Sequence, residues 1–127
     1  MGYKEELSFD MRCAESARVR AKFPSRVAVI VQPGPGAEGL AKSEEAKKRK
    51  YLVPADMTVG QFVYTLRKRF ALPPEKAIFV FVDKVLPPTA EIMGVLDSRH
   101  RDDDGFVYMT YAAENTFGHL NNSTRLT

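Results

Sequence analysis

Apolar positions recur with a helical period between Thr58 and Phe70, and this is the strongest pattern in the chain. Thr58 and Gln61 have the spacing of a capping box, in which each side chain satisfies a backbone donor of the first helical turn. Pro73 and Pro74 follow the segment and would end the helix. One face of this predicted helix carries an apolar stripe, and three basic residues are expected to point to water: the stripe is Val59, Phe62, Val63, Leu66 and Phe70, and the basic residues are Arg67, Lys68 and Arg69.

Strand patterns lie on both sides of this helix. Residues 26–32 are apolar at almost every position, which is typical of a strand covered on both faces. Shorter runs predict strands at residues 51–54, 77–82 and 106–111, and a short helix is expected at residues 90–96 with Thr89 as its cap. The order of elements predicts an α+β fold, with a helix packed across a sheet.

The N-terminal segment, residues 3–23, predicts two helical pieces that lie on a surface. Asp10 is the expected cap of the second piece, and Pro24 ends it. The apolar stripe of this segment is weak and consists of Met11, Cys13, Ala14, Ala17 and Val19.

The composition indicates one soluble domain. The chain has 127 residues, of which 44% are hydrophobic and 28% charged. No run approaches the roughly 18 apolar residues of a membrane span, and the first residues lack the apolar core of a signal peptide. A single cysteine, Cys13, excludes an internal disulfide and fits a reducing compartment, so a cytoplasmic location is expected.

The net charge of +3 is unevenly distributed. Residues 1–50 contain eleven Lys and Arg against seven Asp and Glu, whereas residues 51–127 contain eight against nine. The basic part is most simply a solvated helical face. It could instead bind an acidic partner, such as a membrane surface, a microtubule or RNA.

A glycine-rich loop at residues 34–39 matches the G-x-G-x-x-G pattern of dinucleotide-binding proteins, with Asp56 about twenty residues further on. Three features count against a nucleotide site. Pro35 removes a backbone donor, the charged segment at residues 43–50 has no apolar stripe, and the chain is too short for a doubly wound domain. We therefore expect an exposed connection.

The sequence does not contain a recognisable set of catalytic residues. Its two histidines are His100 and His119, and Cys13 has no histidine near it in sequence. The acidic run before Gly105 fails as a calcium loop because Tyr111 stands where the twelfth ligand would be, and zinc spacing is absent. A polar turn before the last strand explains the run better. We expect no enzyme, no metal, no other bound cofactor and no specific nucleic-acid partner.

Several separated motifs resemble the ubiquitin-like autophagy modifiers, the family of the GABA-receptor-associated protein and the microtubule-associated light chain. The resemblance covers residues 3–118, with one insertion in the loop at residues 33–49. It implies a β-grasp (ubiquitin-like) fold, a four-stranded mixed sheet with a helix across it and two extra N-terminal helices. The implied divisions are residues 1–24, 25–118 and 119–127. The motifs are YKEE at residues 3–6, KYLVPAD at 50–56, TVGQF at 58–62, RKR at 67–69, LPPEKAIF at 72–79, LPPT at 86–89, DGFVY at 104–108 and ENTFG at 114–118.

The resemblance also implies a processing and conjugation site. A cysteine protease would cut after Gly118, which follows Phe117, and would remove residues 119–127. Ubiquitin-type E1 and E2 enzymes would then join the new carboxylate to phosphatidylethanolamine on the autophagosomal membrane. Phe79, Phe81 and Arg69 would contact these enzymes.

The same resemblance implies a groove that adds a receptor peptide of the form aromatic-x-x-aliphatic beside residues 50–54. The expected aromatic pocket is Glu15, Val19, Ile30, Lys50, Leu52 and Phe106, the expected aliphatic pocket is Tyr51, Val53, Pro54, Met57, Phe62 and Leu66, and Lys48, Arg49, Lys50 and Arg69 would attract acidic flanking residues.

Two residues depart from the family pattern. Ala28 stands where proline is common, and Thr65 stands where a larger aliphatic residue is common, so the aliphatic pocket is expected to be more polar. The alternative function is an unprocessed adaptor that binds microtubules or membrane surfaces through Arg12, Arg18 and Arg20 of the basic N-terminal helices.

Overall fold

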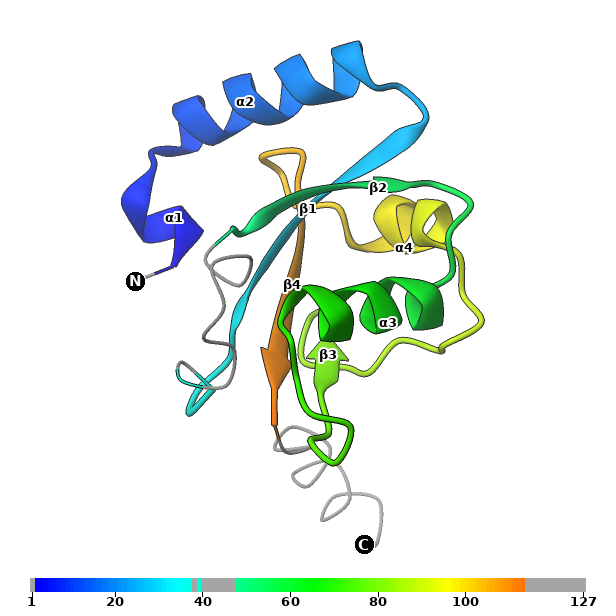
Figure 1. The fold of residues 1–127 in the computed structure, drawn as a ribbon. Helices are drawn as coiled ribbons and strands as arrows, with labels where there is room; N and C mark the ends of the chain where they lie inside the picture. Colours follow the sequence, from blue (N-terminus) through cyan, green and yellow to red (C-terminus); the bar gives the residue numbers. More distant parts are fainter. Residues whose placement is uncertain (1, 38, 40–47, 114–127) are drawn as a thin grey trace, which may run out of the picture.

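The computed structural model describes residues 2–37, 39 and 48–113, and it forms a four-stranded mixed sheet in the order β2-β1-β4-β3 (Figure 1). β1 pairs antiparallel with β2 and parallel with β4, and β3 pairs antiparallel with β4. This arrangement, with a helix across the sheet and two helices before it, is the predicted β-grasp architecture. The strands are β1 (Arg26–Pro33), β2 (Lys50–Pro54), β3 (Phe79–Phe81) and β4 (Val107–Ala112).

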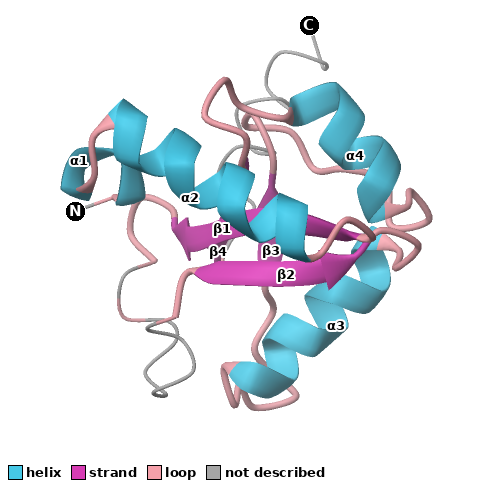
Figure 2. Cartoon of the chain, turned by 90° about the horizontal axis from the view of Figure 1, so that it is seen from above, coloured by secondary structure: helices cyan, strands magenta, loops and turns pink. Residues whose placement is uncertain are grey.

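Helices cover both faces of the sheet. The N-terminal helices α1 (Tyr3–Glu6) and α2 (Phe9–Lys22) lie on one face, while α3 (Val59–Arg69) crosses the other and α4 (Met93–His100) packs at its side (Figures 1 and 2). The central strand explains the continuous apolar run at residues 26–32, because its side chains alternate between two cores. Val27, Val29 and Val31 join the main core with α3, whereas Ala28 and Ile30 join a smaller cluster with Tyr3, Val19 and Phe106.

The predicted capping box begins α3. The Thr58 hydroxyl accepts a hydrogen bond from the Gln61 amide at 3.1 Å, and the Gln61 side-chain oxygen accepts one from the Thr58 amide at 2.9 Å. The predicted stripe is confirmed, since Val59, Phe62, Leu66 and Phe70 are buried.

Arg67 does not point to water as expected. Its guanidinium donates to the backbone carbonyls of Lys76 at 2.5 Å and of Pro73 at 3.1 Å, and so fixes the loop that follows α3. Lys68 and Arg69 are exposed, as predicted.

Two predicted helix caps were wrong. α2 begins two residues earlier than expected, because its cap is Ser8 rather than Asp10, and the Ser8 hydroxyl accepts the bond from the Met11 amide. α4 begins after Ile92, not after Thr89. The first α4 donors bond instead to the carbonyls of Met57 and Ala55, both at 2.8 Å, so a tertiary contact sets the start of this helix: the donors are the amides of Met93 and Gly94.

The strand expected at residues 77–82 is shorter than predicted. Only Phe79–Phe81 pairs with β4, and Val82 turns back to bond with Val85. The turn places Asp83 and Lys84 at positive φ.

A set of polar groups closes the space between α2 and the sheet, and we call it the polar seam: Arg12, Ser16, Arg20, Asp97, Asp104 and Tyr108. Arg12 Nε donates to Asp104 Oδ2 at 2.8 Å, and the hydroxyl groups of Ser16 and Tyr108 donate to the carbonyl and the carboxylate of Asp104. Burial and the bond to Asp104 raise the pKa of Tyr108. Arg20 and Arg101 both bind Asp97.

The acidic run before Gly105 is a polar turn into β4, as predicted. The carboxylate of Asp104 in this turn is buried, and several groups donate hydrogen bonds to it. Asp104 is 1% exposed and also accepts a bond from the Phe106 amide at 2.9 Å. Gly105 has a φ of 96°, and a side chain there would overlap Ser16. No described helix is long and apolar enough to cross a membrane.

Candidate functional site

β2 is an edge strand, since within the described part of the chain it pairs with β1 and with no strand on its other side. The Val31 amide donates to the Arg49 carbonyl at 2.7 Å just before β2 begins. Antiparallel pairs alternate between bonded and non-bonded positions, so the backbone groups of Lys50 and Leu52 face away from β1. The Leu52 carbonyl accepts a long bond, 3.4 Å, from the exposed Arg26 side chain. A strand edge of this kind can pair with an added peptide.

The six residues expected to form an aromatic pocket divide into two groups. Val19, Ile30 and Phe106 are at most 3% exposed and belong to the small core beneath α2. Glu15 and Lys50 lie above them and form an ion pair, and Leu52 is half-buried. The structure thus brings all six into one region, with the ion pair over the apolar floor.

An open hollow of about 520 Å³ lies beside this ion pair, and its lining is mostly apolar. Hydrogen bonds from Arg18 and then Lys50 lower the pKa of Glu15 to about 2, so the carboxylate is charged at neutral pH. The hollow is lined by Tyr3, Leu7, Met11, Ala14, Glu15, Arg18 and Lys50.

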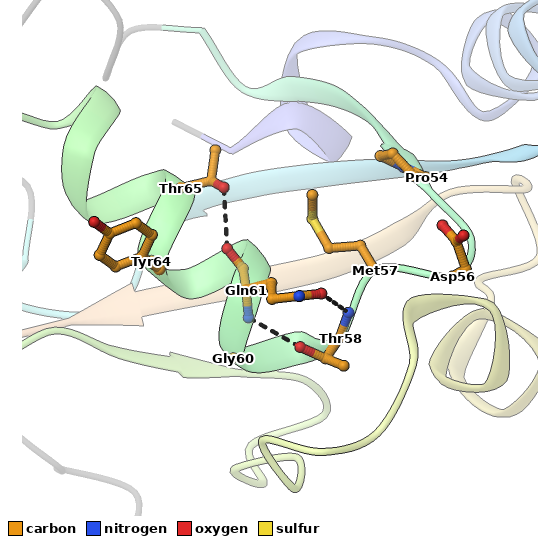
Figure 3. A pocket seen from close by; sticks show the side chains of 8 residues that line it. All are labelled: Pro54, Asp56, Met57, Thr58, Gly60, Gln61, Tyr64 and Thr65. Carbon is orange, nitrogen blue, oxygen red and sulfur yellow. Dashed lines mark hydrogen bonds between the residues drawn. The ribbon is translucent and has the colours of Figure 1, made fainter.

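A second, larger hollow of about 780 Å³ lies at the other end of β2, between that strand and α3 (Figure 3). Of the residues expected in the aliphatic pocket, Pro54 and Met57 line it. Tyr51 is half-buried beside Phe62, and the rest are core side chains, with Leu66 fully buried. The lining is Pro54, Asp56, Met57, Thr58, Gly60, Gln61, Tyr64 and Thr65.

Thr65 takes part in this hollow, as its departure from the family pattern suggested. Its hydroxyl donates to the Gln61 carbonyl one turn earlier at 3.0 Å (Figure 3). The hydroxyl proton is therefore used within the helix, and the oxygen can still accept a bond from a ligand. Tyr64 and Gln61 were not predicted for the site. They lie on the polar face of α3, and the helical period could have placed them beside Thr65.

The four basic residues expected to attract acidic peptide residues have different surroundings. Arg49 binds the Glu6 carboxylate with two bonds, of 2.5 and 2.6 Å, and Lys50 binds Glu15. Lys48 is exposed just before β2, and Arg69 is exposed at the end of α3.

Of the residues expected in processing and conjugation, the three expected to contact enzymes lie in the described part of the chain. Gly118 and Phe117 lie outside the described residues, as does the tail boundary at residue 119. Phe79 is half-buried, Phe81 is 1% exposed, and Arg69 is exposed.

The structure gives little support to the two alternative functions considered from the sequence, a nucleotide site and a basic adaptor surface. The Gly34 amide, which would face a phosphate in a nucleotide site, donates to the Tyr111 carbonyl at 2.8 Å, and Glu38 lies outside the described residues. Arg12 and Arg20 turn inward to the polar seam and offer little charge to an external partner, whereas Arg18 pairs with Glu15 but keeps an exposed side chain. Within the described ranges, no group of three or more His, Cys, Asp or Glu could hold a metal ion.

Comparison with known families gives one match that spans most of the chain. The family model described as "Autophagy protein Atg8 ubiquitin like" matches residues 11–118. The curated "Autophagy-related protein 8" of Emericella nidulans is 55% identical over 118 residues, which cover 91% of this chain and 95% of that protein. "Autophagy-related protein 8b" of Arabidopsis thaliana is 54% identical over 116 residues, covering 91% and 92% of the two chains.

Two solved structures show the same fold. Atg8 of Trypanosoma brucei is 37% identical with a TM-score of 0.78, over 88% of this chain and 93% of that one. Atg8 of Plasmodium falciparum, solved in complex with an Atg3 peptide from the same organism, is 31% identical with a TM-score of 0.77, over 90% and 97% of the two chains.

Proposed function

This chain belongs to the Atg8 family of ubiquitin-like autophagy proteins, and we propose that it is a membrane-conjugated modifier that binds receptor peptides along the free edge of β2. The main support for peptide binding is the position of that edge between two hollows. The backbone groups of Lys50 and Leu52 would pair with the peptide, and the hollows at the two ends of β2 would receive its side chains.

The two hollows give the peptide a direction. An aromatic anchor would enter near Glu15 and Lys50, at the start of β2, and an aliphatic anchor would enter near Pro54 and Met57, at its end. A peptide of the form aromatic-x-x-aliphatic then runs parallel to β2. The aromatic ring must displace the Glu15–Lys50 ion pair to reach Ile30 and Phe106, whereas the aliphatic anchor meets an open hollow.

The conjugation part of the proposal concerns Gly118. A cysteine protease would cut after this residue, and E1 and E2 enzymes would transfer its carboxylate to phosphatidylethanolamine. A glycine suits the position because it lets an extended tail pass through a narrow enzyme channel. The Plasmodium falciparum relative, whose structure contains an Atg3 peptide, supports recognition by a conjugation partner.

Conjugation would turn a protein without a described membrane-spanning helix into an anchored one. Two acyl chains bind a bilayer far more firmly than a single chain, which gives only marginal attachment. The protein would then occur both in the cytoplasm and on the autophagosomal membrane. In this role it is the substrate of enzymes and carries out no reaction of its own.

The intact mass of the native protein tests the conjugation part. Cells are starved, and the protein is recovered from soluble and membrane fractions. We expect a soluble species that ends at Gly118 and a membrane species heavier by one phosphatidylethanolamine, and we expect the Gly118→Ala variant to give neither. A matched variant in the removed tail, Asn121→Ala, should be processed normally. Full lipidation of the Gly118→Ala variant would refute the proposal.

A further inference from the structure

The chain itself contains the peptide motif that is proposed to bind at β2. Residues 117–120 read Phe-Gly-His-Leu, which has the form aromatic-x-x-aliphatic, and they lie outside the described residues. A second match, at residues 79–82, is unsuited to docking because it begins in β3 and its Val82 is 2% exposed. One molecule therefore carries both the groove beside β2 and a segment of the kind that the groove would bind. We call residues 117–120 the tail motif.

The charge around the tail motif fits the groove, but only weakly. Glu114 precedes Phe117 by three positions and is the one acidic residue in residues 113–127. It would approach the basic residues at the start of β2, where Lys48 is exposed. A receptor peptide with several acidic residues gains more from the same cations. The tail motif should therefore bind more weakly than a receptor and be displaced by it.

The chain is too short for the tail motif to reach the β2 edge of its own molecule. β4 lies two strands from β2, so a peptide added beside β2 lies three strand spacings, about 14 Å, from β4 (Figure 1). The pairing registers place Ala112 beyond the level of Lys50 by about 13 Å along the strands. The direct distance is thus about 19 Å, whereas the chain from Ala112 to Phe117 spans at most about 18 Å when fully extended.

The direction of the strands shortens this reach further. β4 runs parallel to β1, and β1 runs antiparallel to β2, so a peptide parallel to β2 runs opposite to β4. A tail that docked on its own molecule would have to reverse direction before Phe117, and a turn uses part of the available length. A second copy of the chain has neither restriction.

We propose that in the unprocessed chain the tail motif docks on the β2 edge of a second copy. Phe117 enters the hollow at the start of β2, and Leu120 enters the hollow at its end. This inference rests on the proposed function, because the tail motif uses the same groove as the receptor peptide. Unprocessed copies then occupy one another's grooves at high local concentration.

Processing after Gly118 would end this self-association. The protease hydrolyses the amide bond between Gly118 and His119 with one water molecule, which leaves a carboxylate on Gly118 and an amine on His119. This bond lies between the two anchors, so the processed chain keeps Phe117 and loses Leu120. The same cut that prepares Gly118 for conjugation thus frees the groove for receptors.

The concentration dependence of NMR spectra of the full chain tests the inference. Amide signals of Lys50 and Leu52 are followed up to about 1 mM chain, a concentration at which even a millimolar dissociation constant is detected. We expect both signals to shift with concentration and the average sedimentation coefficient to rise. Leu120→Ala should abolish both changes, whereas Leu120→Ile should keep them. Leu126→Ala, in the same tail but outside the motif, is the matched control and should behave as the unaltered chain.

Competition with a receptor-type peptide gives a second readout. The synthetic peptide Asp-Asp-Trp-Glu-Glu-Leu carries four acidic residues around the same motif. At about 1 mM chain it should bind the unaltered chain about threefold more weakly than the Leu120→Ala variant, because only copies with a free groove can bind it. In dilute solution the two affinities should be equal.

The outcomes separate the inference from the proposed function. If the synthetic peptide shifts Lys50 and Leu52 but chain concentration does not, the groove binds peptides and the inference is wrong. The inference is also wrong if self-association survives Leu120→Ala, or if that variant alters Lys50 to the same extent at every concentration, since the tail would then dock on its own molecule. If even the synthetic peptide fails to bind, peptide docking at β2 fails, and the inference falls with it.

Discussion

The face of the sheet beneath α3 is closed by apolar side chains, whereas the face beneath α2 is closed largely by ion pairs and hydrogen bonds. The main core beneath α3 includes Phe62, Leu66 and Met109, all at most 2% exposed. The α2 face has a small cluster around Ile30 and Phe106, and the polar seam surrounds it.

The two helices are therefore held to the sheet by different kinds of interaction. Apolar burial is non-directional, so many residues share the stabilisation of α3 and each can be replaced by another of similar volume. A buried ion pair depends on both partners, and loss of one leaves the other charge without compensation. The attachment of α2 should therefore be sensitive to a few polar residues.

The largest expected effect comes from Asp104→Ala. The carboxylate is fully buried and binds Arg12, Tyr108 and the Phe106 amide. We expect a loss of about 3 kcal/mol in the free energy of unfolding, similar to a core Leu66→Ala truncation. Urea denaturation measures both, and Asp103→Ala, an exposed neighbour in the same turn, should cost less than about 0.5 kcal/mol.

Amide hydrogen exchange distinguishes the two faces in these variants. In Asp104→Ala, exchange should accelerate in α2 while α3 stays protected, because the seam opens before the main core. In Leu66→Ala, exchange should accelerate in α3 and the central strands as well. Equal acceleration of α2 and α3 in Asp104→Ala would show that the two faces do not differ in this way.

The sequence predicted the apolar side of this comparison far better than the polar side. Local periodicity and spacing predict the apolar stripe of α3, its capping box and the burial of β1 on both faces, and all three are present. The bond between Arg12 and Asp104 joins residues 92 positions apart and has no local signal. The start of α4 was missed for the same reason, since its first donors bond to Ala55 and Met57.

The candidate site, too, was predicted only in part from the sequence. The resemblance indicated the right region, but it could not tell which side chains face the surface. Leu66 and Thr65 are neighbours on α3, yet Leu66 is fully buried and Thr65 lines the hollow. The position of β2 at the edge of the sheet likewise depends on the pairing of all four strands.

The second-largest expected effect is a loss of unfolding free energy at low pH, because ion-paired carboxylates on the α2 side of the sheet become protonated. Hydrogen bonds from Arg18 and Lys50 lower the pKa of Glu15 from 4.5 to about 2. Burial raises the pKa of Asp97, but bonds from Arg101 and Arg20 outweigh it, and the net shift is also downward. A carboxyl with a lowered pKa stabilises the fold fully above its unfolded value, and this contribution is lost as the pH falls through the folded value.

Comparison of Glu15→Gln with the unaltered chain measures this effect. The difference in unfolding free energy between the two should be constant above pH 4.5 and should shrink toward pH 2. Glu75→Gln, an exposed carboxyl beyond α3, is the control. A difference that does not change between these pH values would contradict the assignment of Glu15 as an ion-paired carboxylate.

The smallest effect concerns the end of α3. Ala71 follows the helix with a φ of 55°, a left-handed conformation that glycine adopts without strain. Ala71→Gly should therefore stabilise the chain by about 0.5–1 kcal/mol on the α3 side and leave the polar seam unchanged. Ala17→Gly, on the exposed face of α2, should destabilise it by about 1 kcal/mol. Thermal denaturation of the two variants gives the sign of each change.

The central claim is that a receptor peptide adds to the free edge of β2, and amide hydrogen exchange within that strand tests it most directly. The peptide Asp-Asp-Trp-Glu-Glu-Leu is added to the full chain, and exchange is followed by NMR. We predict new protection at Lys50 and Leu52, whose amides face the free edge, and little change at Tyr51 and Val53, whose amides already bond to β1. Tight binding without protection at Lys50 and Leu52 would contradict the account.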